Sequence, residues 1–194
     1  MNADGAIARS FRRAAQLIGG DIVVVDQFDR ALLSRTATGG DEYCAAAVSA
    51  AVRREWRRQR RRLSELGHLE VRSLSPGDDA APWIEEFLSM EAKGWKGRSG
   101  NALLRTPRDA TCFRHMCAGA HQAGRFHSTG LYLNGEPVAL QNNILTAGCD
   151  FAMRVAYDEA FSKYSPGVLL ELENIAQMFR RPDFVSMRSC SRPS

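Results

Sequence analysis

The chain has 194 residues, of which 44% are hydrophobic and 25% charged, and its formal net charge is +4. This composition is that of a globular protein and excludes disordered and fibrous chains. No apolar run approaches the roughly 18 residues of a membrane span, and residues 1–20 lack a signal-peptide pattern, so we expect a cytoplasmic protein. The five cysteines are scattered without a C-x-x-C pair, which predicts reduced thiols and no metal site.

The N-terminal third has few regular patterns before a long basic segment. Residues 1–20 are irregular or weakly helical, the β-branched run Asp21–Asp26 predicts a strand, and Thr38–Asp41 predicts a turn. From Glu42 to Leu66 the pattern is helical, Ala-rich at first and then very basic, until Gly67 ends it.

After Gly67 the order of predicted elements indicates the fold class. The predicted elements are a strand at His68–Leu74, helices at Ala81–Ala92 and Thr106–Ala123, strands at Arg125–Leu133, Glu136–Leu145 and Cys149–Tyr157, a helix from Ser165 to Pro182 and a last strand at Phe184–Met187. Asn134-Gly135 is a strong hairpin signal. The order β-α-α-β-β-β-α-β predicts an α+β fold, with an antiparallel meander and one crossover helix in a mixed sheet.

The third strand of the meander has an alternating pattern. Phe151, Met153, Val155 and Tyr157 are expected on one face, and Ala152, Arg154 and Ala156 on the other. The strand leads into a loop and then into Ser165-Pro166-Gly167, which opens an apolar helix. This helix start could bind an anion through its backbone N–H groups, or Ser165 could simply cap it with Pro166 at the first helical position.

Seven arginines lie within ten residues of the basic segment: Arg53, Arg54, Arg57, Arg58, Arg60, Arg61 and Arg62. They are either the solvated end of a helix, favoured by the helix dipole, or a surface for nucleic acid or another polyanion. The small net charge and the near absence of interleaved aromatic residues favour the first interpretation.

Glu91 extends the apolar stripe of its helix, so its carboxylate lies at the core edge or in a pocket. The adjacent loop Gly94–Gly100 offers an aromatic side chain, Trp95, and a cation, Lys96, to a substrate. The chain has no G-x-S-x-G, P-loop, G-x-G-x-x-G or H-E-x-x-H motif, which argues against serine hydrolases, P-loop NTPases and zincins.

Four segments resemble the acetyltransferase-like family that includes the CelD cellulose-biosynthesis protein. They are RRQRRRLSELG (57–67), GWKG (94–97), LYLNGEPVAL (131–140) and AYDEAFSKYSPGVLLELENI (156–175). These BioF-like proteins belong to the GNAT superfamily and are related to the FemAB aminoacyltransferases. The resemblance implies the GNAT fold, a central, mostly antiparallel sheet flanked by helices, and transfer of an acyl group from acetyl-CoA or another acyl-CoA to an amine or hydroxyl.

The resemblance also implies roles for individual residues. The strand Cys149–Tyr157, including Val155, would pair with the pantetheine arm, and the helix start at Ser165, Gly167, Val168 and Leu169 would receive the pyrophosphate. Trp95 and Lys96 would shape the acceptor site. Glu91 or Asp158 would take the proton of the acceptor through water, and Tyr157 or Tyr164 would protonate the leaving thiolate.

The chain departs from the family at its phosphate loop and at its ends. Lys163-Tyr-Ser-Pro-Gly167 replaces the usual Gln/Arg-x-x-Gly-x-Gly/Ala loop, and the family's strands beyond Asp183 are missing. We therefore expect residues 1–40 to be a remnant of a preceding GNAT-like half or an N-terminal extension, 41–66 a long basic helix, and 67–194 an acyltransferase domain incomplete at its C-terminus. The open sheet edge favours self-association.

The expected function is acyl transfer to a small-molecule or envelope-precursor acceptor, in cell-envelope or exopolysaccharide synthesis. The alternatives are a Fem-type transferase that uses aminoacyl-tRNA and an inactive module that binds a partner through Arg53–Arg62. Nucleic acid other than tRNA is not expected as a partner.

Overall fold

The computed structural model describes residues 5–27, 29–35 and 39–190, and the chain divides into two compact units. The first unit, residues 1–29 with 193–194, contains helix α1 (Ala6–Leu17). The second unit, residues 30–192, contains all the other described helices and strands, and it holds the candidate site.

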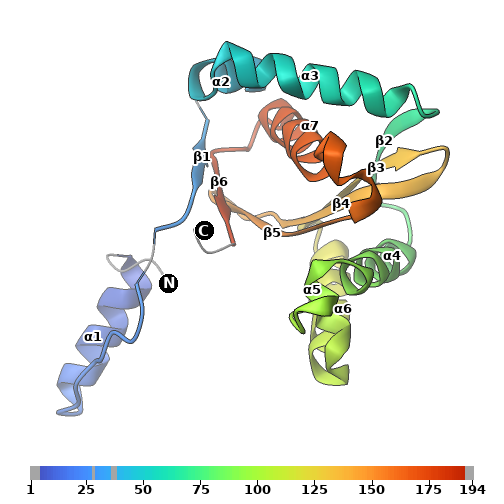
Figure 1. The fold of residues 1–194 in the computed structure, drawn as a ribbon. Coiled ribbons are helices and arrows are strands. Elements are labelled where there is room, and N and C mark those ends of the chain that lie inside the picture. Colours follow the sequence, from blue (N-terminus) through green and yellow to red (C-terminus); the bar gives the residue numbers. More distant parts are fainter. Residues whose placement is uncertain (1–4, 28, 36–38, 191–194) are drawn as a thin grey trace. The chain divides into compact units, whose positions relative to one another are not determined.

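A six-stranded sheet forms the centre of the second unit, in the order β1-β6-β5-β4-β3-β2 (Figure 1). The strands are β1 (Leu32–Ser34), β2 (Leu69–Ser73), β3 (Phe126–Leu133), β4 (Glu136–Ile144), β5 (Asp150–Tyr157) and β6 (Ser186–Ser189). Neighbouring strands are antiparallel except β5 and β6, which run parallel. The predicted meander, and the return of the chain through a crossover helix, are confirmed.

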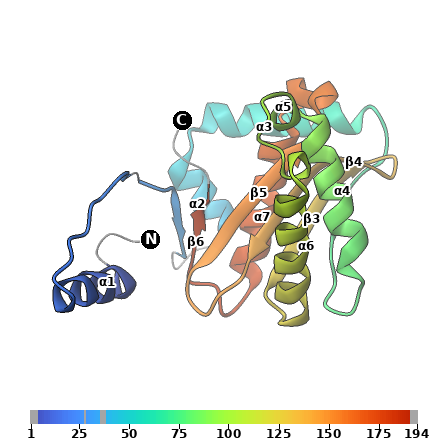
Figure 2. The same ribbon diagram turned by 90° about the horizontal axis from the view of Figure 1, so that it is seen from below.

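Helices cover both faces of this sheet (Figures 1 and 2). On one face lie α4 (Ala80–Lys93), α5 (Trp95–Arg98) and α6 (Pro107–Gln122); on the other lies α7 (Pro166–Arg180), covered by α2 (Gly40–Ala47) and α3 (Ala50–Ser64). Two 3-10 turns, η1 (Leu103–Arg105) and η2 (Glu159–Tyr164), connect these elements. The mixed α/β class and the flanked antiparallel sheet are those expected.

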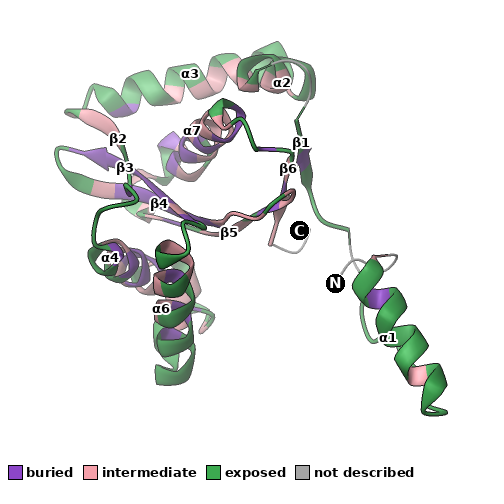
Figure 3. Ribbon diagram, turned by 180° about the vertical axis from the view of Figure 1, so that it is seen from behind, coloured by how far each residue is buried: buried purple, intermediate pink, exposed green. Residues whose placement is uncertain are grey.

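The core follows the apolar stripes of the helices (Figure 3). Phe87 of α4 is fully buried and stacks on Phe113 of α6, with ring centroids 5.5 Å apart. On the opposite face, Leu63 of α3 and Leu170 of α7 pack against Leu131 of β3 in a second cluster. Burial of each such side chain contributes about 1.5–3 kcal/mol, so the sheet is held from both sides.

The strand predicted at Asp21–Asp26 is wrong, because residues 21–27 have no regular structure. Val23 and Val25 are 80% and 92% exposed, and in the part of the chain that the structure describes no strand pairs with them. β-branched residues favour an extended backbone, but a strand also needs a partner for its N–H and C=O groups. The edge strand forms instead at β1, where Leu33 is buried opposite Met187 of β6.

The helix predicted across Glu42–Leu66 consists of two helices. Val48 is extended, and the Ser49 hydroxyl accepts a hydrogen bond from the Val52 N–H at 3.4 Å, so α3 has its own N-cap. Gly40 and Asp41, from the predicted turn, begin α2, whereas Thr38 lies outside the described residues.

The hairpin predicted at Asn134-Gly135 is confirmed. Both residues have positive φ, 53° and 87°, as the two-residue type I′ turn requires. The Asn134 side chain also accepts a hydrogen bond from the His68 N–H at 2.8 Å, which ties the turn to the start of β2.

Candidate active site

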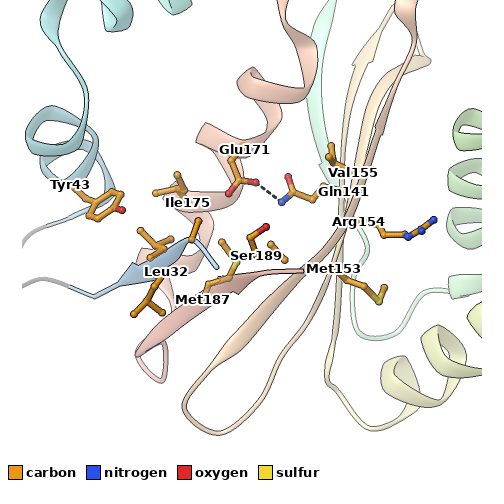
Figure 4. A pocket seen from close by; sticks show the side chains of 13 residues that line it. Leu32, Tyr43, Gln141, Met153, Arg154, Val155, Glu171, Ile175, Met187 and Ser189 are labelled. Atoms are coloured by element: carbon orange, nitrogen blue, oxygen red, sulfur yellow. Dashed lines mark hydrogen bonds between the residues drawn. The ribbon is translucent and has the colours of Figure 1, made fainter. Parts of the chain in front are cut away.

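β5 and β6 separate after a short parallel pairing. Residues Asp150–Ala152 of β5 pair with Met187–Ser189 of β6, and beyond Ala152 this edge of β5 has no strand partner among the described residues. A cavity of about 260 Å³ lies where the strands diverge (Figure 4). Its walls come from β1, β4, β5, β6, α2 and α7, and they include Leu32, Tyr43, Gln141, Val155, Glu171, Ile175 and Met187.

A β-bulge in β5 faces this cavity. Asn142 pairs with Arg154 and Asn143 with Ala152, so Met153 is an extra residue. The predicted alternation is interrupted at this bulge: Met153 packs against the α4–α6 cluster, on the same face as Arg154, and Ala152 packs with the α7 side. Beyond the bulge it is confirmed, with Val155 and Tyr157 toward α7 and Arg154 and Ala156 toward α4. Figure 4 shows the Met153 and Arg154 side chains pointing the same way, away from Glu171.

Glu91 is the centre of a buried charge cluster on the α4 face. It is 2% exposed, and its Oε1 accepts hydrogen bonds from the Arg154 guanidinium and, at 3.2 Å, from Lys96 Nζ. Its Oε2 accepts from the Leu103 N–H at 2.9 Å. Both carboxylate oxygens are therefore occupied, and the cluster joins α4, α5 and η1 to the bulge of β5.

Lys96 reaches the edge of β5 as well. Its Nζ donates to the carbonyl oxygen of Val155 at 2.9 Å, three residues beyond the last pairing with β6. Burial lowers the pKa of the Lys96 ammonium, and the nearby Glu91 carboxylate opposes this shift. Lys96 is thus a cation held at the open strand edge.

The structure brings together five of the residues that the sequence analysis selected. Glu91, Trp95, Lys96, Val155 and Tyr157 line one small recess between α4, α5 and β5. Trp95 is 50% exposed, and its backbone N–H donates to Glu159 Oε1 at 2.8 Å. The Tyr157 hydroxyl makes no hydrogen bond within the described residues, so it is free to contact a ligand.

Short α5 replaces the loop predicted at Gly94–Gly100. Gly97 packs so closely on α4 that a Cβ at this position would collide with the carbonyl oxygen of Ala92. This close approach holds Trp95 and Lys96 against the recess.

The start of α7 lies beside Tyr157. A Cβ at Gly167 would come within 3.4 Å of the Tyr157 ring, and Val168 is 40% exposed. Ser165 is left-handed, with φ 51°, and its side chain makes no capping bond, so the predicted Ser165 side-chain cap is wrong, while Pro166 does begin the helix. Ser165 and Gly167 are partly accessible.

The remaining candidates lie apart from the recess. Asp158 is exposed, and its Oδ1 accepts from the Ala160 N–H at 2.9 Å as the N-cap of η2. Tyr164 and Leu169 are 6% and 2% exposed and belong to the α3–α7 core cluster.

A second polar cluster, on the α7 face, was missed by sequence reasoning. Gln141 of β4 donates from Nε2 to Glu171 Oε2, and Asn174 donates to the same oxygen at 3.5 Å. Burial raises the pKa of Glu171, against the lowering effect of these two hydrogen bonds. The available signal was that Glu171 and Asn174 are polar positions three residues apart, and so on one face, of a helix with an apolar stripe.

The arginine cluster lies on α3, and three of its members are ion-paired. Arg60 pairs with Glu173 of α7 at 2.5 Å, while Arg58 and Arg61 pair with Glu55 and Glu65 along their own helix. Three others point to solvent: Arg54, Arg57 and Arg62. Part of the cluster therefore fastens α3 to α7.

The described residues contain no group of three His, Cys, Asp or Glu side chains that could hold a metal ion. Among the same residues, no helix is both long and apolar enough to cross a membrane.

Residues 50–185, more than two-thirds of the chain, match the acetyltransferase (GNAT) domain family. No curated protein sequence matches the chain. Among solved structures, a conserved protein of unknown function from Bacteroides thetaiotaomicron VPI-5482 is similar with a TM-score of 0.56 and 11% identity, covering 94% of this chain and 64% of that chain.

Two further structures carry acetyltransferase names. A tandem GNAT protein from the clavulanic acid biosynthesis pathway has a TM-score of 0.51 and 13% identity, with coverage of 100% of this chain and 53% of that chain. An aminoglycoside acetyltransferase from an uncultured soil metagenomic sample, in complex with sisomicin, has a TM-score of 0.45 and 12% identity, with coverage of 63% of this chain and 77% of that chain. At these identities the likeness to the first two proteins concerns the fold, and the chain spans between half and two-thirds of their length.

Proposed function

The chain belongs to the acetyltransferase (GNAT) domain family, and from that premise we propose that it transfers an acyl group from acyl-CoA to an amine or hydroxyl acceptor. The observation that carries this proposal is the unpaired edge of β5 beyond Ala152, next to a cavity and to the start of α7. An extended ligand arm can pair with such an edge through backbone hydrogen bonds.

The residues present fit a nucleotide thioester. Backbone N–H groups at a helix start favour phosphate oxygens. The Val168 and Leu169 N–H groups already donate to the Ser165 carbonyl oxygen, at 3.0 and 3.1 Å. The groups proposed to meet the pyrophosphate are therefore Ser165 and the Gly167 N–H, which are partly accessible, with exposed Val168 beside them, whereas buried Leu169 would only support the helix start. Val155 lies on the open strand edge and would meet the pantetheine arm. The bound thioester supplies an activated acyl carbonyl.

In the proposed mechanism the acceptor nitrogen or oxygen attacks the acyl carbonyl, the new bond forms, and the carbon–sulfur bond breaks. Tyr157 is the better placed of the two tyrosines to give its proton to the leaving thiolate, because its ring lies beside Gly167 at the start of α7 and its hydroxyl has no hydrogen-bond partner among the described residues. Tyr164 is the weaker candidate, because it is buried in the core cluster. Asp158 keeps one carboxylate oxygen free to receive the acceptor's proton through water.

Glu91 has another part in this proposal. Since both of its oxygens are occupied, we assign it to positioning Lys96 and Arg154 at the edge of β5 rather than to proton transfer. Trp95, half exposed beside them, would shape the acceptor site.

Thermal unfolding with and without acetyl-CoA tests this proposal, because a ligand at 100 times its Kd stabilises by about 2.7 kcal/mol. Gly167→Glu places a carboxylate at the proposed phosphate position and should abolish the shift. Gly119→Glu, at an open helical glycine of α6, is the matched control and should retain it. An unchanged shift in Gly167→Glu, or no shift in the wild type, would contradict the proposal.

Turnover is tested by mass spectrometry of released CoA with amine and hydroxyl acceptors. We expect Tyr157→Phe and Asp158→Asn to lower kcat at least tenfold. Asp109→Asn, which changes an exposed residue of α6, should leave kcat unchanged. If Tyr157→Phe keeps full turnover, the tyrosine is not the acid.

The segments AYDE and YSPG, at 156–159 and 164–167, support the finer proposal of a CelD-like transferase acting on a cell-envelope or exopolysaccharide precursor. The exposed Arg54, Arg57 and Arg62 support the tRNA-dependent alternative. Binding of tRNA that weakens steeply with salt, and aminoacyl transfer in place of CoA release, would select that alternative.

A further inference from the structure

The cavity between β5, β6 and α7 has two hydrogen-bond acceptors on its wall that lack a donor. Gln141 is 3% exposed, and its Oε1 has no hydrogen-bond partner. Glu171 is partly exposed, and the hydrogen bonds that it accepts within the described residues both reach Oε2, so Oε1 has no donor among those residues. Figure 4 shows the Gln141 and Glu171 side chains directed at one another from β4 and α7, with Ile175 and Met187 beside them.

No cationic side chain among the described residues pairs with Glu171. Arg154, the cation on the cavity wall, points to the opposite face of the sheet and is held there by Glu91 (Figure 4). A buried polar atom such as Gln141 Oε1 is normally paired, because a lost hydrogen bond destabilises the fold, and a partly buried carboxylate such as Glu171 is stabilised by a nearby cation. A carboxylate and an amide oxygen left together in this way match a ligand that carries several N–H donors and a positive charge.

The rest of the wall is apolar. Leu32, Ala152, Val155, Ile175 and Met187 surround the two acceptors, so the group that brings the cation can also bury an aliphatic stem.

We infer that this cavity is a binding site for a primary ammonium group on a short aliphatic chain, with Glu171 and Gln141 as its acceptors. The ammonium offers three N–H donors, of which one reaches Glu171 and another Gln141 Oε1, and its charge offsets that of the partly buried carboxylate. The inference goes beyond the proposed acyl transfer, because it concerns what the cavity binds whether or not transfer takes place.

The full chain, labelled with ¹⁵N, is titrated with n-butylammonium chloride and, separately, with n-butanol, and backbone and Gln side-chain shifts are followed by NMR. We expect saturable shifts around the cavity with butylammonium and none with butanol at the same concentrations. Glu171→Gln, which keeps the size and an acceptor for Gln141, should weaken butylammonium binding at least tenfold. Glu173→Gln is the matched control on the same helix, because Glu173 is ion-paired with Arg60 outside the cavity.

Each contrary outcome is separable from failure of the proposed function. Equal binding of butanol, no binding of butylammonium to the wild type, or equal binding by Glu171→Gln overturns the inference. If Glu171 is a neutral carboxyl that donates to a flipped Gln141 amide, butylammonium will not bind. If Glu171→Gln does not fold, the wild-type comparison of the two probes still decides. A thermal shift with acetyl-CoA, measured in parallel, reports the proposed function independently.

Discussion

Replacing Glu91 by glutamine tests whether this carboxylate holds the site together. Glu91→Gln keeps an acceptor for the Leu103 N–H but removes the charge that pairs with Lys96 and Arg154. Removing one partner of a fully buried pair costs 3–5 kcal/mol, but the Lys96 and Arg154 side chains are 20% and 31% exposed and can regain water. We therefore expect a loss of about 2 kcal/mol in the free energy of unfolding.

Urea unfolding measures this loss. With a slope of about 2 kcal/mol per molar urea, the midpoint should fall by about 1 M. Glu91→Ala also leaves the Leu103 N–H without a partner and should cost a further 1–2 kcal/mol or so. Glu85→Gln is the matched control, since Glu85, on the same helix, is 53% exposed in its pair with Arg114, and it should change stability by at most about 0.5 kcal/mol.

A double-mutant cycle with Arg154→Met separates the ion pair from other effects, and we expect a coupling energy of about 1 kcal/mol or more. If Glu91→Gln unfolds at the same urea concentration as Glu85→Gln, Glu91 does not anchor the cluster. Loss of turnover without loss of stability would then return it to the role of general base.

Other predictions use single groups of the same unit. The folded-state pKa of Glu171 is raised, so the stabilising contribution of this group is full below the unfolded-state pKa of about 4.5 and is lost as pH rises through the folded-state pKa. The free energy of unfolding of Glu171→Gln relative to the wild type should therefore increase with pH in urea titrations. A difference that stays constant with pH would refute this prediction. Gly97→Ala should lower the free energy of unfolding by about 1–3 kcal/mol through overpacking. Gly119→Ala, in an open helical position, should raise it by roughly 0.5–1 kcal/mol. Equal effects of the two substitutions in calorimetry would disprove the close approach of Gly97 to the Ala92 carbonyl oxygen. Burial raises the pKa of Cys117 to about 12, while Cys112 is exposed; iodoacetamide should label Cys112 in the native chain and Cys117 only after unfolding, as read by peptide mass spectrometry.

Sequence patterns predicted the elements whose stability is local or comes from one apolar face. The Asn134-Gly135 turn is predicted by backbone preference alone, because these two residues tolerate positive φ. The stripe with Ile84, Phe87 and Leu88 predicted α4, since a helical period places them on one buried face. The order of these elements was enough for the fold class.

Patterns of the same kind failed where the local structure depends on a pairing partner elsewhere in the chain or on the backbone conformation. The run at 21–26 has high β-propensity, yet no strand lies beside it in the described residues, whereas the less conspicuous Leu32–Ser34 pairs with β6. Ser165 has the side chain of a cap but a left-handed backbone, and the bulge at Met153 interrupts the alternation along β5 and moves Met153 to the opposite face from the one predicted.

The sequence by itself determined the helices α4, α6 and α7, the meander, the family and a set of candidate residues around 91–97 and 155–169. Only the tertiary structure decided which of them meet. Glu91 and Arg154 are 63 residues apart and Gln141 and Glu171 are 30 apart, and no periodic pattern encodes such pairs. Their contacts depend on strand register, on the bulge and on the packing of α4 and α7 against opposite faces of the sheet, because side-chain chemistry at this distance is set by the path of the backbone.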